Sequence, residues 1–413
     1  MGKQPKVCIM GLGYIGLPTA AVIASRGMQV VGVDVTQRVI DTINQGKIHI
    51  KEPDLDVAVR SVVIAGNLKA CLKPEVADIF IIAVPTPFKD GKKPDLRYVE
   101  AAANAIAPVL RKGNLVILES TSPVGTTEKL SEWLAHARPD LHFPHDSDEA
   151  ADICVAHCPE RVLPGKILME LITNDRVVGG ITPECAQQAA DFYKKFVSGA
   201  CLLTNARTAE MAKLTENTFR DVNIAFANEL SLICDELNID VWELISLANR
   251  HPRVNILQPG PGVGGHCIAV DPWFVVDSAP ETARLTKLAR QINDIKPEFV
   301  VRKIRELAEN HQNPTICCLG LAFKANVDDL RESPAMEIVK LLAEDGQLAI
   351  KVVEPNIAAL PEALGGYSNI EFEEDRSHIL DADICVLLVA HREFENLESF
   401  FPKSRDFLKV SNI

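Results

Sequence analysis

A glycine-rich turn near the start of the chain constrains the fold more than any other feature. Gly11-Leu12-Gly13-Tyr14-Ile15-Gly16 follows an apolar strand expected at residues 6–10 and precedes an alanine-rich helix expected at residues 17–26. Gly27 ends that helix, and a second strand is expected at residues 29–35. A strand, a glycine turn, a helix and a second strand form a βαβ unit of a parallel sheet. The chain is therefore expected to begin with a doubly wound α/β domain.

An acidic residue at the end of the second expected strand indicates what the turn binds. Asp34 lies near the spacing of about 20 residues at which an acid hydrogen-bonds a ribose 2′-hydroxyl. Its carboxylate would repel a 2′-phosphate, so the predicted cofactor is NAD rather than NADP. Gly11, Gly13 and Gly16 are the expected backbone contacts of that cofactor. A tight turn without a ligand is the alternative interpretation.

An internal repeat extends the prediction to the other end of the chain. The apolar stretch at residues 77–84 is echoed at residues 382–389, and a strand, a helix and a strand precede each copy. The pattern predicts two doubly wound Rossmann-like α/β domains. The second copy lacks the glycine fingerprint, so we expect it to hold something other than the dinucleotide.

A helical segment is expected between the two α/β domains. Residues 208–249 have apolar positions at helical spacing almost throughout, and residues 283–296 continue the pattern up to Pro297. Such a segment commonly forms a dimer core, so we expect a homodimer. The expected domains are residues 1–206 for NAD, 207–300 for dimerisation and the cysteine loop described below, and 301–413 for a second nucleotide ligand.

Composition excludes several classes of protein. The 413 residues suffice for two or three domains at a prior of about 150 residues each. A net charge of -13 argues against nucleic acid or an anionic membrane as the main partner. Eleven cysteines, without paired metal-ligand spacing, indicate reduced thiols in a cytoplasmic protein. No apolar run approaches the ~20 residues that span a bilayer.

The strongest candidate for chemistry is a second glycine-rich loop, residues 260–267, which we call the cysteine loop. Its glycines let the backbone approach a ligand closely, and Cys267 at its end supplies a nucleophile that reacts as the thiolate. Asp271 follows four residues later. A structural cysteine in a packed loop is the alternative. His251 and His266 have no partner at metal-binding spacing, so no metal site is predicted.

Two further groups of polar residues are candidates. Turn-forming segments follow three expected strands of the first domain at residues 85–87, 120–127 and 159–161, and the carboxyl ends of parallel strands meet in one crevice. On the central helix, a polar face recurs at intervals of three and four through Glu210, Lys213, Asn217 and Arg220. Ordinary turns and a solvated helical face are the respective alternatives.

Taken together, these segments resemble the nucleotide-sugar 6-dehydrogenase family, which includes UDP-glucose dehydrogenase. The resemblance extends along nearly the whole chain and rests on residues 11–16, 85–87, 120–127, 210–217, 260–267, 320–324 and 329–333. It implies oxidation of a sugar C6 alcohol to a carboxylate with two NAD, through a thiohemiacetal and a thioester on Cys267. Lys213, Asn217, Asp271 and Glu160 are the implied proton-transfer and oxyanion residues, with roles that exchange among Lys213, Asp271 and Glu160.

The resemblance also implies the binding residues. NAD would contact Tyr14, Ile15, Asp34, Thr86, Thr121, Thr127 and Arg331. The UDP-sugar would contact Arg161, Val162, Lys213, Asn217, Arg220, Gly264, Phe323 and Lys324, with His251 and Arg253 supplied across a dimer interface.

The identity of the sugar is a separate expectation. Pro164 stands where UDP-glucose dehydrogenases carry a second acid, so the resemblance implies UDP-N-acetyl-D-mannosamine as substrate, for a bacterial surface polysaccharide. UDP-N-acetyl-D-glucosamine is the alternative sugar. A single-step 3-hydroxyacid or phosphogluconate-type dehydrogenase and a non-catalytic NAD-sensing protein are the rival functions.

Overall fold

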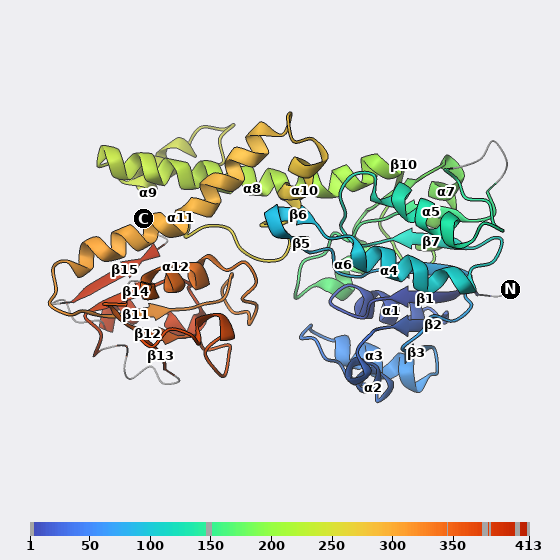
Figure 1. The fold of residues 1–413 in the computed structure, drawn as a ribbon, viewed down its shortest axis with the longest axis horizontal. Coiled ribbons are helices and arrows are strands. Elements are labelled where there is room, and N and C mark those ends of the chain that lie inside the picture. Colours follow the sequence, from blue (N-terminus) through green and yellow to red (C-terminus); the bar gives the residue numbers. More distant parts are fainter. Residues whose placement is uncertain are drawn as a thin grey trace. The chain divides into compact units, whose positions relative to one another are not determined.

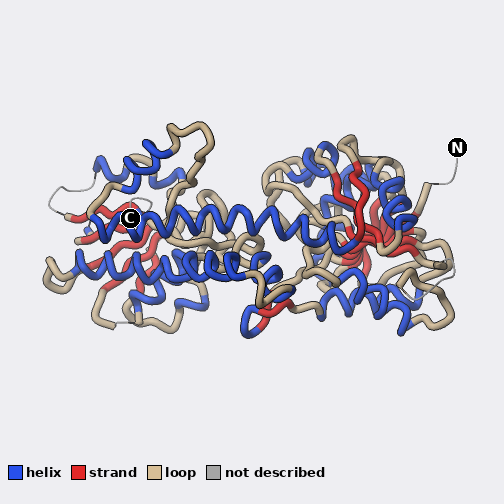
Figure 2. The backbone as a smooth tube through the Cα atoms, turned by 90° about the horizontal axis from the view of Figure 1, so that it is seen from above, coloured by secondary structure: helices blue, strands red, loops and turns tan. Residues whose placement is uncertain are grey.

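The computed structural model describes residues 4–145, 151–344, 346–373, 379, 381–400 and 405–410. The chain divides into two compact units, Met1–Glu216 and Asn217–Ile413. The boundary falls within the long helix α8 (Ala206–Leu237), which is drawn in Figures 1 and 2. Each unit is described by itself below.

The first unit is built on a sheet of eight strands in the order β10-β9-β8-β7-β4-β1-β2-β3. Neighbouring strands are parallel except β8 and β9, which are antiparallel. The strands are β1 (Lys6–Met10), β2 (Gln29–Val33), β3 (Leu68–Cys71), β4 (Ile79–Ile82), β7 (Leu115–Leu118), β8 (Cys154–His157), β9 (Arg176–Gly180) and β10 (Cys201–Asn205). The short strands β5 (Phe88–Lys89) and β6 (Lys93–Pro94) form a separate antiparallel pair.

Helices cover both faces of this sheet (Figure 1). Alternate residues of β1 divide between two apolar cores, with Val7 and Ile9 in one and Cys8 and Met10 in the other. The first core holds α1 (Gly16–Ser25), α2 (Gln37–Asn44), α3 (Leu55–Ile64), α6 (Ile167–Thr173) and α7 (Pro183–Tyr193). The second core holds α4 (Arg97–Ile106) and α5 (Thr126–Ala137). The predicted doubly wound architecture is confirmed here.

The second unit contains a smaller parallel sheet in the order β13-β12-β11-β14-β15. Its strands are β11 (Thr315–Leu319), β12 (Ala349–Val353), β13 (Ile370–Phe372), β14 (Ile384–Leu387) and β15 (Asp406–Lys409). Helix α12 (Pro334–Ala343) and the end of α11 (Arg284–Ala308) pack on one face, and the start of α13 (Leu397–Phe400) lies on the other. The predicted second doubly wound domain is therefore also confirmed.

The central segment is helical but less continuous than the sequence predicts. Helix α8 ends at Leu237, Asn238 has a φ of 54°, and Asp240 caps the next helix, α9 (Val241–Ala248), by accepting from two backbone N–H groups. Helix α10 (Asp271–Ser278) follows the cysteine loop and precedes α11. A left-handed residue and an N-cap explain the interruption that periodicity alone did not reveal.

Helix α11 continues through Pro297, where the sequence predicts that it ends. A proline inside a helix has no N–H to donate to the carbonyl four residues earlier. Here that carbonyl belongs to Asn293. A Cβ atom added to Gly262 would lie 3.0 Å from that oxygen, so the cysteine loop packs against the interrupted turn. Burial of Pro297 and its neighbours in the fold thus overrides the local breaking signal.

The two Rossmann-like domains share backbone hydrogen bonds as well as topology. Gly11 donates to the carbonyl of the last residue of β2 at 2.8 Å, and Gly320 donates to that of β12 at 2.9 Å. Their φ angles are 93° and 92°. Residues 320–325 therefore form the same kind of turn as residues 11–16, although the second domain delays its helix until Pro334.

Candidate functional site

The three glycines of the first turn serve two distinct purposes. A Cβ at Gly11 would lie 2.6 Å from the carbonyl oxygen of Ala83, and one at Gly16 would lie 1.9 Å from that of Gly11. A Cβ at Gly13 would meet nothing within 4 Å. Gly11 and Gly16 therefore allow close packing, whereas Gly13 leaves backbone open to an approaching pyrophosphate. This cradle fits the predicted dinucleotide.

Asp34 is held beside this turn. Its carboxylate accepts the backbone N–H of Leu12 at 3.2 Å and that of Thr36 at 3.0 Å, and the side chain remains half-buried. A fixed carboxylate at the end of β2 is the acceptor that a ribose diol requires. Tyr14 is 42% exposed and Ile15 is half-buried on the same turn.

The predicted convergence of strand-end loops is confirmed within the first unit. Strands β1, β4, β7 and β8 are parallel neighbours, so their carboxyl ends share one edge. Thr86 Oγ1 donates to the carbonyl of Thr121 at 2.5 Å, and Ser120 Oγ donates to that of Val84 at 2.7 Å. These bonds join the loops after β4 and β7 beside the glycine turn.

Thr127 and Glu210 form a buried contact that the sequence did not reveal. Glu210 accepts the backbone N–H groups of Gly125 and Thr127 and the Thr127 hydroxyl at 2.6–2.7 Å. Neither side chain is exposed to solvent. Glu210 therefore caps α5, where a carboxylate favours the N-terminal end of the helix dipole. The Thr127 hydroxyl donates its hydrogen to Glu210. The contact of Thr127 with NAD stays a prediction.

Glu160 belongs to a buried charged cluster. Its Oε2 accepts from Arg176 at 2.9 Å and its Oε1 from the backbone N–H of Arg161 at 2.6 Å, so both oxygens are engaged. Glu119 lies 3.9 Å from the same guanidinium, and burial followed by repulsion from Glu160 raises the pKa of Glu119 to about 8. The sequence analysis did not identify Arg176 or Glu119, because neither belongs to a recognisable motif.

Arg161 contacts the central helix. Its guanidinium pairs with Glu216 at 2.6 Å and donates to the carbonyl of Asp175 at 3.3 Å. Val162 beside it is half-buried. On the same helix Lys213 is half-buried and pairs with no carboxylate among the described residues, whereas Arg220 is exposed. Unlike the Arg161 guanidinium, which pairs with Glu216, the Lys213 ammonium group thus pairs with no described carboxylate.

In the second unit the structure brings together three predicted catalytic residues. Cys267 is half-buried, and its carbonyl accepts the backbone N–H of Asp271 at 2.8 Å. Asp271, which is 3% exposed, accepts from Asn217 Nδ2 at 2.5 Å. Asp271 therefore joins the start of α10, four residues after Cys267, to Asn217 of α8. A carboxylate and an amide held together in this way can bind an oxygen substituent of a ligand.

The other end of the cysteine loop lies against the turn at residues 320–325. A Cβ at Gly265 would lie 2.8 Å from the ring of Phe323, and one at Gly264 would lie 2.4 Å from the carbonyl of Glu332. Gly265 also donates its N–H to the carbonyl of Arg331 at 3.0 Å. Only glycine permits this approach. Lys324 on the same turn is exposed.

Arg331, predicted to reach NAD, lies beside the cysteine loop. Its guanidinium donates to both carboxylate oxygens of Asp329 at 2.9 and 2.6 Å and contacts His266 Nδ1 at 3.0 Å. Its side chain is 56% exposed, so it remains accessible to a ligand. Arg331 therefore contacts the residue that directly precedes Cys267 in the chain.

A buried polar network supports the start of the cysteine loop and was missed by sequence reasoning. Arg290 and Asn293 of α11 donate to Asp221 of α8 at 2.6 and 2.8 Å, and Asn228 joins Asn293 at 2.8 Å. Asn228 also accepts the N–H of Gly260 at 2.8 Å. The seven-residue spacing of Asp221 and Asn228 within an apolar helix was the available signal.

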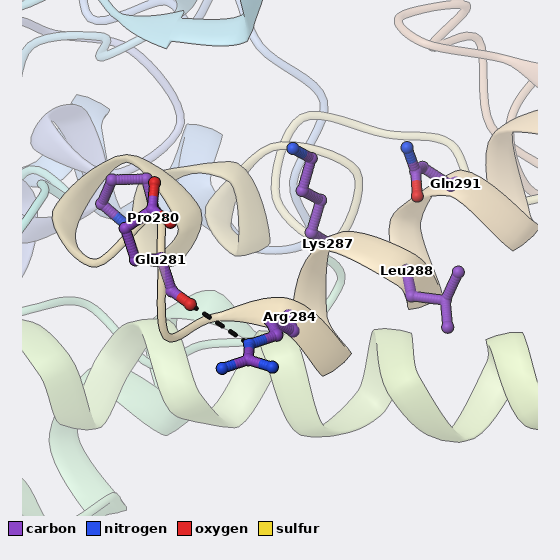
Figure 3. A pocket seen from close by; sticks show the side chains of 6 residues that line it. All are labelled: Pro280, Glu281, Arg284, Lys287, Leu288 and Gln291. Carbon is purple, nitrogen blue, oxygen red and sulfur yellow. Dashed lines mark hydrogen bonds between the residues drawn. The ribbon is translucent and has the colours of Figure 1, made fainter.

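His251 and Arg253 lie in an exposed loop after α9. A hollow of about 310 Å³ at the start of α11 is lined by Pro280, Glu281, Arg284, Lys287, Leu288 and Gln291 (Figure 3). It contains none of the predicted site residues. Over the described ranges, no cluster of three or more His, Cys, Asp or Glu has metal-binding geometry, and no helix could span a membrane. The eleven cysteines carry thiols and form no disulfide with one another.

The fold and the site define a dinucleotide-dependent dehydrogenase. The chain belongs to the UDP-glucose/GDP-mannose dehydrogenase family, whose NAD binding domain matches residues 5–197, whose central domain matches residues 207–295 and whose UDP binding domain matches residues 317–409. It is thus an NAD-dependent nucleotide-sugar dehydrogenase, which decides against the single-step hydroxyacid and NAD-sensing rivals.

Individual relatives are similar over most of the chain. An NDP-N-acetyl-D-galactosaminuronic acid dehydrogenase of Ralstonia nicotianae is 61% identical over 97% of this chain and 94% of its own. A UDP-N-acetyl-D-mannosamine dehydrogenase of Campylobacter jejuni is 60% identical over 97% and 98%. The solved UDP-D-ManNAc dehydrogenase of Pyrococcus horikoshii is 38% identical, with a TM-score of 0.87 over 98% and 99% of the two chains.

Proposed function

We propose that this protein oxidises C6 of a UDP-N-acetylhexosamine to the carboxylate, with two NAD consumed per sugar and Cys267 as the covalent nucleophile. The observation that carries the proposal is the contact of the Cys267 carbonyl, Asp271 and Asn217 at the end of a glycine-rich loop. Separate proposed roles for the three parts of the chain are NAD binding by residues 1–206, dimerisation by residues 207–300 and UDP-sugar binding by residues 301–413.

The glycine turn and Asp34 would hold NAD, whose nicotinamide accepts one hydride in each oxidation. A base removes the proton of the C6 hydroxyl as the first hydride leaves, and the resulting aldehyde carbon bonds to Cys267 Sγ to give a thiohemiacetal. Loss of the second hydride and the hydroxyl proton gives a thioester. Water then adds at the carbonyl and the thiolate departs, leaving the carboxylate.

The contact between Asn217 and Asp271 supports a role for both in binding the C6 oxygen and in moving the hydrolytic proton. Asn217 Nδ2 already donates to Asp271, so the pair can present an amide donor to an oxyanion and a carboxylate to a water molecule. Lys213 lies one helical turn before Asn217 and carries an ammonium group that stabilises a developing alkoxide. Glu160, whose oxygens accept from Arg176 and Arg161, is a less direct candidate base.

We propose UDP-N-acetyl-D-mannosamine as the substrate. Pro164 occupies the position of the second acid of UDP-glucose dehydrogenases and lies exposed in the loop after β8. A relative named for N-acetyl-D-mannosamine is 60% identical and one named for N-acetyl-D-galactosaminuronic acid is 61% identical, so the N-acetyl group is better supported than the ring configuration.

The deciding experiment supplies NAD with UDP-N-acetylmannosamine, UDP-N-acetylglucosamine or UDP-N-acetylgalactosamine in separate reactions. NADH and uronate are both quantified. We expect two NADH per uronate with the manno sugar only. Preference for the galacto or gluco sugar would replace the substrate assignment, whereas one NADH with an accumulating aldehyde would overturn the covalent scheme.

We also propose that the protein is a homodimer joined along α8. Large apolar side chains recur every seven residues on this helix at Phe219, Phe226 and Ile233, and they are 70%, 51% and 44% exposed. A repeat of seven residues gives one helical face. An exposed apolar stripe of this kind marks a protein interface. The exposed loop with His251 and Arg253 would then be free to reach a partner's site.

A further inference from the structure

In the second domain, Glu354 occupies the position that Asp34 has in the first. Each acid follows the second strand of its domain, and each accepts the backbone N–H after the turn glycine, from Leu12 at 3.2 Å and from Leu321 at 2.7 Å. Asp34 is half-buried, whereas Glu354 is 3% exposed. The site that reads a ribose in one domain is therefore closed in the other.

His391 is the residue that closes it. His391 Nε2 lies 3.0 Å from Glu354 Oε2, and Nδ1 receives the backbone N–H of Asn326 at 2.8 Å. Because Nδ1 accepts, the ring hydrogen belongs to Nε2 and is donated to Glu354. Burial raises the pKa of Glu354, but hydrogen bonds from His391 and from backbone amides outweigh it and hold that pKa at about 2. The pair is thus an imidazole that donates its Nε2 hydrogen to an ionised carboxylate.

The pair fixes the direction of the chain after the turn. Asn326 has a φ of 62°, a left-handed conformation, and its Oδ1 accepts the backbone N–H of Arg392 at 2.9 Å. In the first domain the helix starts at the equivalent point, but here it starts only at Pro334. His391 therefore holds the bend that opens the loop at residues 326–333.

This loop and turn form the surface on which the cysteine loop lies. Phe323 donates its N–H to the carbonyl of Asp329 at 3.1 Å, which holds its ring against Gly265. Gly265 in turn donates to the carbonyl of Arg331. A continuous set of contacts therefore runs from Glu354 and His391 to the residues just before Cys267.

We propose that His391 is a positioning residue for Cys267, acting through Glu354, the turn at residues 320–326 and Phe323. The catalytic effect of His391 rests on the proposed function, because His391 affects turnover in this way only if Cys267 is the nucleophile. The mechanical connection itself does not depend on that chemistry. A displacement of a reacting group by about 1 Å is enough to cost roughly 10²-fold in rate.

Hydrogen exchange of the full-length protein tests the connection without turnover. His391→Ala removes the ring's hydrogen bonds with Glu354, Asn326 and Asn356, and we expect the amides of residues 321–326 and of Gly265 to exchange about tenfold faster together. His391→Asn keeps an acceptor near the Nδ1 position and should restore most of the protection. The matched control is His311→Ala, which breaks a histidine–aspartate pair with Asp406 elsewhere in the same domain.

Two further results separate the proposal from simple destabilisation and from the proposed function. Phe323→Leu should speed exchange of Gly265 while leaving peptides around Glu354 and His391 unchanged. Unchanged Gly265 exchange in His391→Ala, with faster exchange at residues 321–326, would overturn the positioning role. In kinetics, His391→Ala should lower kcat about 10²-fold with unchanged NAD affinity. Turnover retained by Cys267→Ser would instead overturn the proposed function while leaving the exchange result intact.

Discussion

At the scale of single residues, four carboxylates of this chain differ in how deeply they are buried and in which groups donate hydrogen bonds to them. Asp34 accepts one backbone N–H group on each oxygen and stays half-buried, whereas Glu210 and Glu160, whose oxygens are also both engaged, are buried. Glu354 is closed by His391. All four look alike in the sequence as acids near helix or strand ends. Burial, which the sequence does not show, separates the acid proposed to bind a ribose from the other three.

Replacing Cys267 with serine tests the nucleophile. Serine keeps the size and a hydroxyl but loses the soft thiolate, so uronate formation should fall by at least about 10³-fold while NAD affinity stays unchanged. Uronate is measured by chromatography and NAD binding by calorimetry. The control is Cys71→Ser, another half-buried cysteine whose pKa is raised by burial. Full turnover by the Cys267 variant would rule out the covalent scheme.

Glu119 makes the first unit sensitive to pH. Burial and repulsion from Glu160 raise the pKa of Glu119 from 4.5 to about 8, so the folded chain holds a proton that the unfolded chain releases. Its stabilising contribution is complete below about pH 4.5 and is lost as the pH rises to 8. In Glu119→Gln, thermal midpoints should fall less steeply across this window.

The control for this pH experiment is Glu132→Gln, which changes an exposed carboxylate of α5. Its midpoints should follow those of the unaltered protein at every pH. Parallel profiles for Glu119→Gln and the unaltered protein would mean that Glu119 is ionised in the folded state.

At the scale of elements, α8 combines two kinds of surface. Its polar positions Asp221 and Asn228 are buried against α11, whereas its apolar positions Phe219, Phe226 and Ile233 are exposed. Leu214, Ala225 and Cys234 of the same helix are buried as well, so the exposed apolar stripe is additional to the apolar face that packs on the fold. This second stripe is the surface on which the proposed dimer rests.

A charged residue within the stripe should separate the dimer. Phe226→Lys places an ammonium group in the proposed interface, where leaving it unpaired and buried costs several kcal/mol. We expect sedimentation velocity to show a monomer at concentrations where the unaltered protein is a dimer. Val57→Lys, at an exposed apolar position of α3, should leave the dimer intact. A dimeric Phe226→Lys protein would place the interface elsewhere.

Element boundaries show where sequence reasoning succeeds and where it stops. The strand at Lys6–Met10 and the helix after the first glycine turn follow from local pattern, and both are confirmed. The break at Asn238 had a local signal in the N-cap Asp240, which apolar periodicity does not detect. The passage of α11 through Pro297 depends instead on burial by distant parts of the fold, and no local window contains that information.

At the scale of the whole molecule, the repeat at residues 77–84 and 382–389 allowed both α/β domains to be predicted. It corresponds to β4 and β14, which lie beside the first strand of each sheet. The association of Cys267 with Asp271 and Asn217 was predicted only through the family resemblance. The buried cluster around Arg176 and the closure of Glu354 by His391 were not predicted, because their partners are far apart in the sequence.

The two domains should respond to different ligands. NAD alone should slow hydrogen exchange around residues 11–16 and 34, and UDP alone should slow it around residues 320–331. At a concentration of about 100 times Kd, each ligand adds about 2.7 kcal/mol to the stability of the unit that binds it. NADP at equal concentration serves as the control for the first unit. Protection of residues 11–16 by UDP alone would contradict the division of roles.

The turn at residues 320–325 keeps the backbone of residues 11–16 with only the first of its glycines. Its backbone bonds and left-handed glycine match those of residues 11–16, yet Ala322 and Ala325 stand where Gly13 and Gly16 would be. With methyl groups in the turn and His391 on the acid, no single substitution would convert the second turn into a copy of the first.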